Sequence, residues 1–565
     1  RIVFRGDIVK DEEGKFAVFT EQGASASHMA AAKFMDAIAR MPGNYGEDSD
    51  AVGAYTQVTL EEAAKILGDD VITETWISLP PHRRPKSWAG IEDPVCPLVR
   101  NLYGHPLAGL LWEKYQEKAL MALGWEKVNS WECLYVHRKQ RLFLSCYVDD
   151  YKMAGKKQNI APMWEALKKE GIDLEPPIPL QTNTYLGCGQ HPVKPDKDLI
   201  AERRKMFDRI CHNKFSGKPI NAEGDLLPAD SLPVQPNGPK SKKSNKKKKG
   251  NPTAASLAGG GTQSSDQFNN ESVKAYCYDM NGHVKQTVDR YLELSKKEVE
   301  SLKQVSTPCM DDHQIPPEEF GVKGELAPIA ARVVLKALYV ARIARLDFMW
   351  AVNSLAREVH KWTAACDRRL HRLISYLHHT KDFVQLCYVG DMPSKCKLVL
   401  YSDASFAGDL RDSKSTSGGL LCLVGPSTYV PVSWICKKQT CQSHSTSEAE
   451  VIALDAGARM EGLPGLLLWD LVISVFEPDG PVKAPVPLSS KELAIVHRNY
   501  YDMFGSIDYV PPSLPITYGR ATLIILEDND AVIKMCIKER FPTLRHVART
   551  HRCNLDWLFE RLNRD

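Results

Sequence analysis

Two adjacent aspartates, Asp149 and Asp150, separate two short and mostly apolar segments, residues 141–146 and 151–154. Segments of this length and composition favour β-strands joined by a tight turn. The pair is therefore predicted at the tip of a hairpin, where carboxylate oxygens can bind a divalent cation. Neighbouring strand residues point to opposite faces, so one aspartate is expected to bind the cation directly and the other to assist. Because such pairs also occur in ordinary solvated turns, the rest of the chain must decide between the two interpretations.

Size and composition indicate a globular protein of several domains. The chain has 565 residues, which predicts about two to four domains. Its net charge of +3 neither requires nor excludes a nucleic-acid partner. The 15 cysteines contain no Cys-x-x-Cys pair, which predicts free thiols in a reducing intracellular compartment. No signal peptide is visible, and the apolar stretch at residues 464–476 is interrupted by Asp470 and too short to cross a membrane.

Composition divides the chain into four predicted segments. Residues 1–200 alternate strand-like and helix-like stretches. Residues 201–270 are rich in Pro, Ser and Gly and contain a run of lysines, so a linker or insertion is predicted there. Residues 271–395 are predicted to be helical, with two or three helices toward the end. Residues 396–565 form the last block, which has a Pro-rich insertion at 478–515.

A third acid, Asp50, lies about a hundred residues before the aspartate pair and is followed five residues later by Tyr55. An acid, an aromatic residue and a distant Asp-Asp hairpin follow one another in this order in polymerase palms. At this point the chain resembles the reverse transcriptases of copia-type retrotransposon Pol polyproteins. The segments that carry the resemblance are residues 1–6, 50–60, 101–112, 147–150 and 185–187.

The resemblance implies specific roles for residues of the first block. Its catalytic acids would be Asp50, Asp149 and Asp150, which would bind two Mg²⁺ ions, with Mn²⁺ as an alternative. The implied substrate contacts are Arg1 and Arg5 with the triphosphate, Tyr55 with the incoming sugar, and Tyr147 and Val148 with the primer end. Segment 1–6 is expected to be a basic strand of the fingers.

A second set of acids is expected to converge in the last block. Asp403 and Asp528 each follow an apolar, strand-like segment. A cluster of Ser and Thr before Glu448 is typical of a helix start, which places Glu448 in the first turn. Two strand ends and one helix start can bring three carboxylates to one point, as a two-metal nuclease requires. Glu450 is interpreted as a solvated helix acid.

The last block resembles the ribonuclease H domain of the same polyproteins. The matching segments are residues 401–408, 414–418, 434–439, 447–450, 527–529 and 549–556. The resemblance implies that Asp403, Glu448 and Asp528 are catalytic and bind two Mg²⁺ ions. Asn554 stands where the family usually has a fourth carboxylate, so it would be a neutral ligand and metal affinity is expected to fall. In the first block, Leu107 stands where the family usually has a glutamine.

We therefore expect an α+β right-hand polymerase followed by a helical connection and an α/β ribonuclease H-like domain. The fingers and palm would occupy residues 1–200, a linker 201–270, the thumb and connection helices 271–395, and the nuclease 396–565. The expected function is RNA-directed DNA synthesis with removal of RNA from the RNA–DNA hybrid. Its partners would be an RNA template, a DNA primer, the hybrid and deoxynucleoside triphosphates, with no membrane.

The resemblance also implies a setting for the chain. A protease and an integrase of the same polyprotein would precede Arg1, and the protein would act inside the cell, in a cytoplasmic virus-like particle, the nucleus or both. Two alternatives remain open. One is a decayed or co-opted remnant that binds nucleic acid without catalysis, and the other is a nuclease with an inert palm.

Overall fold

The computed structural model of the chain describes most of the globular blocks and the helical region between them. The described residues are 3–5, 9, 27–67, 75–180, 184–211, 273–409, 412–480, 482, 519–540, 544, 546–551 and 553–564. Arg1, residues 212–270 of the predicted linker, and nearly all of the predicted insertion at 478–515 lie outside these residues.

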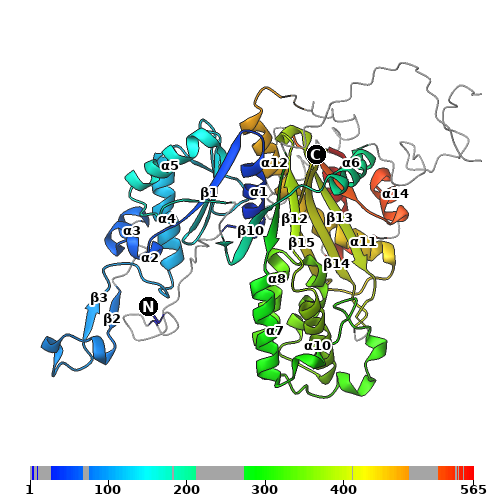
Figure 1. Cartoon of the computed structure of the whole chain (residues 1–565), viewed down its shortest axis with the longest axis horizontal. Coiled ribbons are helices and arrows are strands. Elements are labelled where there is room, and N and C mark those ends of the chain that lie inside the picture. Colours follow the sequence, from blue (N-terminus) through cyan, green and yellow to red (C-terminus); the bar gives the residue numbers. More distant parts are fainter. Residues whose placement is uncertain are drawn as a thin grey trace, which may run out of the picture.

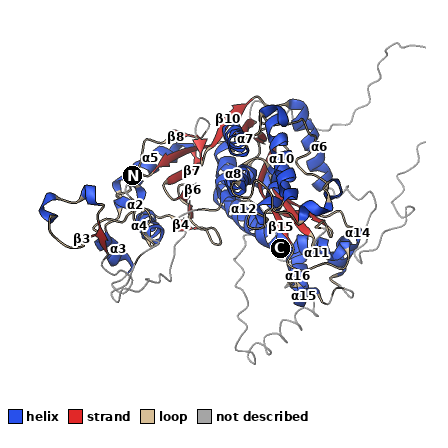
Figure 2. Ribbon diagram, turned by 90° about the horizontal axis from the view of Figure 1, so that it is seen from below, coloured by secondary structure: helices blue, strands red, loops and turns tan. Residues whose placement is uncertain are grey.

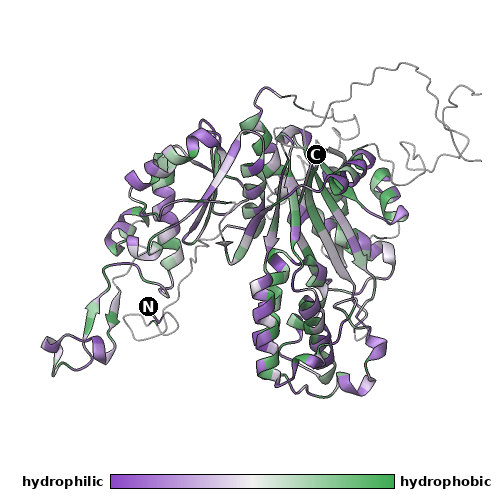
Figure 3. Cartoon of the chain, viewed as in Figure 1, coloured by the Kyte–Doolittle hydropathy of each residue, from purple (hydrophilic) through white to green (hydrophobic). Residues whose placement is uncertain are grey.

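The first block is built on a six-stranded antiparallel sheet (Figure 1). In sheet order its strands are β4 (Glu126–Lys127), β5 (Leu134–His137), β6 (Leu142–Tyr147), β7 (Asp150–Lys156), β1 (Asn44–Asp50) and β8 (Ile178–Pro179). The strand β1 is polar along most of its length, and Figure 3 shows it as a hydrophilic arrow. The predicted hairpin is confirmed, because β6 pairs with β7 and places Tyr147 opposite Asp150.

Side-chain alternation along β7 gives this sheet two different faces. Tyr151 and Met153 face a core shared with the helices of the block. Those helices are α2 (Ala54–Gln57), α3 (Leu60–Leu67), α4 (Ala108–Ala122) and α5 (Lys157–Lys169). Lys152 and Ala154 face the other side, where α1 (Met29–Arg40) lies. Asp150 belongs to the same face as Lys152 by the strand period of two. A small ribbon of β2 (Trp76–Ser78) and β3 (Val95–Pro97) projects from the block (Figure 1).

A second, eight-stranded sheet runs through the rest of the molecule. In sheet order its strands are β16 (Leu523–Leu526), β13 (Lys397–Ser405), β14 (Thr416–Gly425), β15 (Thr428–Lys438), β12 (Gln385–Val389), β11 (Lys274–Asp279), β10 (Cys188–Val193) and β9 (Thr184–Tyr185). The pairing of β13 with β16 is parallel, and the other pairs are antiparallel. One continuous sheet is therefore assembled from three of the four predicted segments.

The structure corrects one predicted segment boundary and the predicted content of another segment. Helix α6 (Lys197–Cys211) crosses the boundary at residue 200 and packs Phe207 and Ile210 against Val399 and Cys422 of the larger sheet. Residues 201–211 therefore belong to the fold and not to a linker. Segment 271–395 supplies the strands β11 and β12 in addition to its helices.

The helices of the central region pack mainly against one another, at one end of the larger sheet (Figure 1). They are α7 (Asn281–Ser295), α8 (Ala330–Ile343), α9 (Met349–Arg357) and α10 (Ala364–His379). Figures 1 and 2 show α7, α8 and α10 side by side, and the last three helices confirm the two or three predicted near the end of this segment. The last block adds α11 (Thr446–Gly457), a π-helical turn η11 (Ala458–Gly462), α12 (Leu463–Phe476), α14 (Asp530–Lys538), α15 (Val547–Thr550) and α16 (Leu555–Arg564).

Two simpler expectations can be compared with the structure directly. All 15 cysteines are free thiols, as predicted. In the described part of the chain, every helix is too short or too polar to span a membrane.

Helix α1 packs against both sheets and joins them through one hydrophobic core. The ring of Phe34 stacks on Trp469 of α12 at 5.9 Å and meets Trp131 of the first block edge-on at 5.8 Å. Trp131 Nε1 also donates a hydrogen bond to the Pro464 carbonyl at 3.1 Å. The first block and the last block are therefore in direct apolar contact.

A buried polar network lies on the same helix. Asp36 is 1% exposed and accepts hydrogen bonds from Lys152 Nζ at 2.8 Å, Tyr278 Oη at 2.7 Å and Gln190 Nε2 at 2.9 Å. These donors come from β7, β11 and β10, so one carboxylate connects the two sheets. Arg40 donates to the Gln190 side-chain oxygen at 3.0 Å and extends the network.

Replacing Asp36 with asparagine should lower the free energy of unfolding by about 3–5 kcal/mol, because Lys152 would remain as a buried charge without its carboxylate. Urea unfolding followed by circular dichroism would measure the loss. The control is Glu61→Gln, which breaks an ion pair to Lys65 whose side chains are 80% and 71% exposed and should leave stability nearly unchanged. Equal effects of the two substitutions would contradict this account of the network.

Candidate functional site

The hairpin that carries Asp149 and Asp150 is held in a strained turn. Val148 has a φ of +60°, which is uncommon for a β-branched residue. Its carbonyl accepts a hydrogen bond from Trp112 Nε1 at 2.6 Å, and the Asp149 carbonyl accepts one from the Ala51 amide at 2.7 Å. Both contacts come from elements packed beside the turn, so they fix the conformation that presents the two aspartates.

Strand pairing brings Asp50 to the same place. Asp50 ends β1 and lies directly opposite Asp150 in the antiparallel register. Burial, the charges of Asp50 and Asp149, and a hydrogen bond with Asp50 raise the pKa of Asp150 to about 7, and Lys152 acts in the opposite direction. The three predicted acids are therefore neighbours that repel one another, a situation that a bound cation relieves.

The implied substrate-binding residues have more varied surroundings. Tyr55 is half-buried, and its ring centroid lies 4.6 Å from that of Tyr103. Tyr147 lines a cavity of about 700 Å³ between the hairpin, α8 and η11. Arg5 is exposed, and residues 3–5 form no strand, so the expectation of a basic strand there is not met in the described residues.

Leu107 is 6% exposed and belongs to the hydrophobic core of the first block. Its side chain therefore packs inside the fold, at the position where the resemblance leads one to expect a polar glutamine.

A second group of carboxylates gathers at one end of the larger sheet. Asp403 lies near the end of β13, Asp528 follows β16, and the two strands are parallel neighbours. Glu450 joins them from the first half of α11, and ligand oxygens of all three residues lie within 4.8 Å of one another. Among the described residues, this is the one group of three or more potential metal ligands whose ligand atoms all lie within 4.8 Å of one another. Asp50, Asp149 and Asp150 do not form such a group.

The third member of this group corrects the sequence prediction, which chose Glu448 and interpreted Glu450 as solvated. Residues two apart on a helix point about 200° away from each other, so only one of them can face the strand ends. Glu450 is 7% exposed and faces Asp403, whereas Glu448 is fully buried on the other side of α11.

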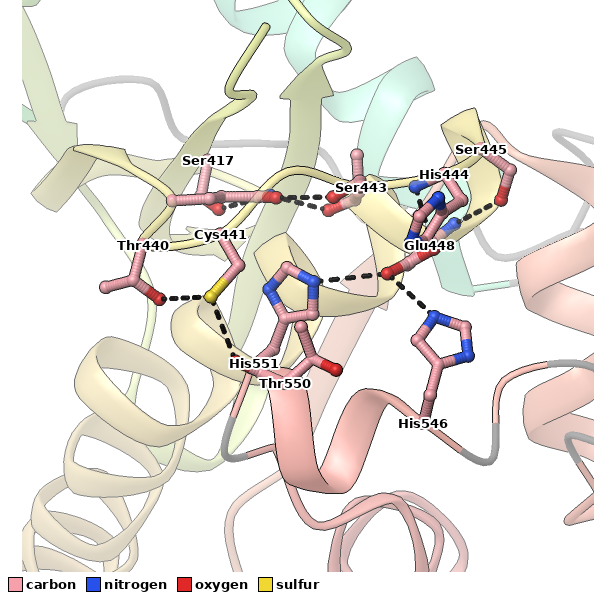
Figure 4. A network of polar contacts seen from close by, with 12 residues as sticks. Ser417, Thr440, Cys441, Ser443, His444, Ser445, Glu448, His546, Thr550 and His551 are labelled. Atoms are coloured by element: carbon pink, nitrogen blue, oxygen red, sulfur yellow. Dashed lines mark hydrogen bonds and ion pairs between the residues drawn. The ribbon is translucent and has the colours of Figure 1, made fainter. Parts of the chain in front are cut away.

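Glu448 is bonded to the protein itself (Figure 4). Its carboxylate accepts hydrogen bonds from the His444 amide at 2.9 Å, and it lies 3.2 Å from His546 Nε2 and 3.1 Å from His551 Nε2. Ser445 completes the helix start by accepting a hydrogen bond from the Glu448 amide. The Ser-to-Glu pattern thus identified a capping motif correctly, and the capping glutamate is not the residue that faces the other acids.

Burial and charge repulsion act on the group of three acids. Burial, and then the charges of Asp403 and Asp528, raise the pKa of Glu450 to about 7. Burial raises the pKa of Glu527 to about 7 as well, and the charges of Glu450, Asp528 and Asp403 add to the shift. One carboxylate oxygen each of Glu450 and Glu527 is buried without a hydrogen-bond partner in the described part of the chain. Sequence reasoning quoted Glu527 in a motif but gave it no role.

Asn554, the predicted neutral ligand, has another contact in the structure. Its side-chain oxygen accepts a hydrogen bond from the Trp557 amide at 3.1 Å, which caps the start of α16. The residue is exposed, as is Asp556 two positions later. A role for Asn554 in binding metal remains a prediction.

The three gathered carboxylates have the chemistry that a hard divalent cation requires. Mg²⁺ and Mn²⁺ prefer oxygen ligands and are bound through carboxylates whose negative charge balances the ion. Asp403 and Asp528 are exposed, so ligands from solvent can reach the same point. The residues present therefore fit a divalent-cation site that is open to solvent.

The fold and these two acid groups define a mixed α/β protein with candidate metal sites in two different sheets. No family model matches the chain. The "Retrovirus-related Pol polyprotein from transposon RE2" of Arabidopsis thaliana is 34% identical over 123 residues, which are 22% of this chain and 8% of that protein. The corresponding polyprotein from transposon TNT 1-94 of Nicotiana tabacum is 29% identical over 369 residues, which are 65% of this chain and 21% of that protein.

The homologues of this chain are thus retrovirus-related Pol polyproteins from copia-like transposons, and the matches span only a small part of their length. The "Secreted RxLR effector protein 161" of Plasmopara viticola is also 34% identical over 118 residues, which are 78% of that protein and 21% of this chain. That protein and the matched segment of this chain belong to one family.

In EDTA, the stability of the protein should fall as pH rises from about 5 to about 7, because ionising Glu450 is disfavoured in the folded state and not in the unfolded state. The substitution Glu450→Gln should reduce this fall by about 1 kcal/mol. Glu448→Gln should instead lower stability over the whole range, because its carboxylate accepts several hydrogen bonds. Thermal unfolding at several pH values would measure both effects, and a steeper fall for Glu450→Gln than for the unsubstituted protein would contradict the assignment.

Proposed function

We propose that this chain is the RNA-directed DNA polymerase and ribonuclease H portion of a retrotransposon polyprotein. The observation that carries the proposal is the convergence of Asp403, Glu450 and Asp528 at the end of a mixed sheet, in a chain whose homologues are Pol polyproteins. The Asp149–Asp150 hairpin opposite Asp50 supports the polymerase half.

For the nuclease, Asp403, Glu450 and Asp528 would hold the divalent ions. Bound Mg²⁺ lowers the pKa of a coordinated water and neutralises charge that develops on the phosphodiester. The protein's own contribution is position. The two aspartates reach out from adjacent strand ends, and Glu450 is fixed from α11 with the Ala404 amide as a hydrogen-bond donor.

The two histidines that contact Glu448 differ in access to solvent. The side chain of His546 is 41% exposed and that of His551 is 1% exposed, and Glu448 contacts both rings. His551 anchors the C-terminal segment from inside the fold.

For the polymerase, Asp50, Asp149 and Asp150 would hold the ions at the hairpin. The chemistry supplied is again charge neutralisation at the transferred phosphate, so the protein acts mainly by positioning. Tyr55 lies five residues after Asp50 and packs on Tyr103. It would contact the sugar of the incoming nucleotide. The RNA template, DNA primer, hybrid and deoxynucleoside triphosphates are the proposed partners.

Two observations favour a second candidate, a nuclease with an inert polymerase block. The nuclease acids already gather within 4.8 Å, and the three acids of the hairpin do not. In addition, Leu107 is buried in the core of the first block. Assays of the two activities on the same preparation separate the candidates.

Cleavage of the RNA strand of an RNA–DNA hybrid in Mg²⁺ should fall about 100-fold or more on Asp403→Asn, because a metal-binding charge is removed. Glu450→Gln should have a similar effect. Asp556→Asn is the matched control, since Asp556 is exposed and outside the group, and it should retain normal cleavage. Cleavage that persists in Asp403→Asn would refute the proposed nuclease site.

Extension of a DNA primer on an RNA template should be lost, by about 100-fold or more, on Asp149→Asn. Asp173→Asn is the control, because Asp173 is exposed and its backbone, not its carboxylate, forms the hydrogen bonds to its neighbours. Hybrid cleavage without any extension by the unsubstituted chain would favour the nuclease-only candidate.

A further inference from the structure

We infer that a groove in the helical region is a binding site for a nucleotide-like molecule, in which phosphate groups are attached to a ring. The groove lies between α10 and the irregular chain that precedes α8. It shares no residue with either group of acids, so binding there does not depend on the proposed function.

One face of α10 forms a wall of this groove. The residues of that face recur at the helical spacing of three or four, and they are Ala364, Asp367, Arg368, His371, Arg372 and Ser375. The opposite wall comes from residues between 297 and 325, and the groove encloses about 660 Å³, a size typical of small-molecule sites. Because α10 leads into β12 at its C-terminal end, its first turns lie away from the larger sheet (Figure 1).

Most carboxylates of the groove already have partners within the protein. Glu319 accepts two hydrogen bonds from the Arg368 guanidinium, at 2.5 and 2.7 Å. Asp367 accepts one from Trp362 Nε1 at 2.6 Å and one from the Glu325 amide at 2.7 Å. Among the lining residues that the structure describes, Glu325 is the remaining acid, and it is exposed. Little negative charge is therefore left to repel an anion.

Four cationic side chains of the groove have no carboxylate partner in the described part of the chain. Lys297, Lys303 and Lys323 are exposed and form no side-chain hydrogen bond to other described residues. Arg372 donates hydrogen bonds to the carbonyl and the hydroxyl of Thr307, which are neutral. Four cations against one acid leave a positive surplus, and Lys and Arg are the side chains that bind phosphate groups.

Apolar side chains lie in the same groove. Val305 and Met310 are half-buried, and Val305 packs against the hydrophobic core, which fixes this part of the wall. Val322 is 56% exposed although its side chain is apolar. A ring of the ligand would cover Val322 while its phosphates contact the lysines. A nucleic-acid duplex is convex and would leave such a hollow unfilled, so a small molecule fits better.

The test is equilibrium dialysis of the full chain against labelled ATP, in EDTA and at physiological ionic strength. EDTA removes the divalent ions that nucleotide binding at the hairpin would require under the proposed function. We expect the pair of substitutions Lys297→Gln and Lys303→Gln to weaken ATP binding at least about tenfold, because two charges that bind phosphate are removed. Both side chains are exposed, so thermal unfolding without ATP should be unchanged.

The matched control is the pair Lys361→Gln and Lys381→Gln. These lysines are exposed in the same region, lie outside the groove and remove the same charge, so ATP binding should be unchanged. An equal loss in both pairs would show a general attraction to positive charge and would overturn the inference. Adenosine that binds as tightly as ATP would refute phosphate recognition, and tripolyphosphate that binds as tightly would refute the contact with a ring.

A further variant adds a charge without removing any contact of the fold. Val322→Glu places a carboxylate at an exposed position of the groove and should also weaken ATP binding. If the unsubstituted chain binds no ATP, the inference is refuted. If, in addition, the Lys297 and Lys303 pair of substitutions weakens binding of an RNA–DNA hybrid, the groove is a nucleic-acid contact instead.

Discussion

The buried carboxylate of Asp36 links the two sheets of the molecule through α1. It accepts hydrogen bonds from a lysine of the first sheet and from a tyrosine and a glutamine of the larger sheet, and all of these side chains are buried. Removing charged groups from water costs several kcal/mol for each ion, and this cost is offset only when the pairing is complete. The two sheets therefore hold α1 between them, and separating them would remove the hydrogen bonds that Tyr278 and Gln190 donate to Asp36.

The same network connects the aspartate hairpin to the larger sheet. Lys152 is two residues from Asp150 on one face of β7, and its positive charge favours the ionised form of Asp150. Asp36 fixes Lys152, so the position of the hairpin depends on the strands that pack against α1. Asp403 and Asp528 lie at the edge of the larger sheet that is formed by β16 and β13, away from β10. Under the proposed function, this arrangement gives a rigid spacing between the site that extends a strand and the site that cleaves one.

Local patterns in the sequence predicted the hairpin, the strand ends and the helix start, because alternation and capping depend on neighbouring residues. The choice between Glu448 and Glu450 could not be made in this way. Both sides of α11 are buried, so hydrophobicity does not reveal which side faces the strands. The joining of the segments into one sheet depends on two long-range pairings, β10 with β11 and Tyr388 of β12 with Tyr429 of β15, and neither has a local signal. The burial of Asp36 could not be predicted from the sequence either, because charged residues usually lie at the surface.

We propose that Asp403, Glu450 and Asp528 form a divalent-cation site and that Glu448 belongs to the supporting structure. Anomalous diffraction from crystals grown with Mn²⁺ tests this claim most directly, because it locates the ion without reference to activity. We expect an anomalous peak bounded by oxygens of these three residues, with Glu448 still bonded to His546 and His551. A peak coordinated by Glu448, or no peak at the ends of β13 and β16, would contradict it.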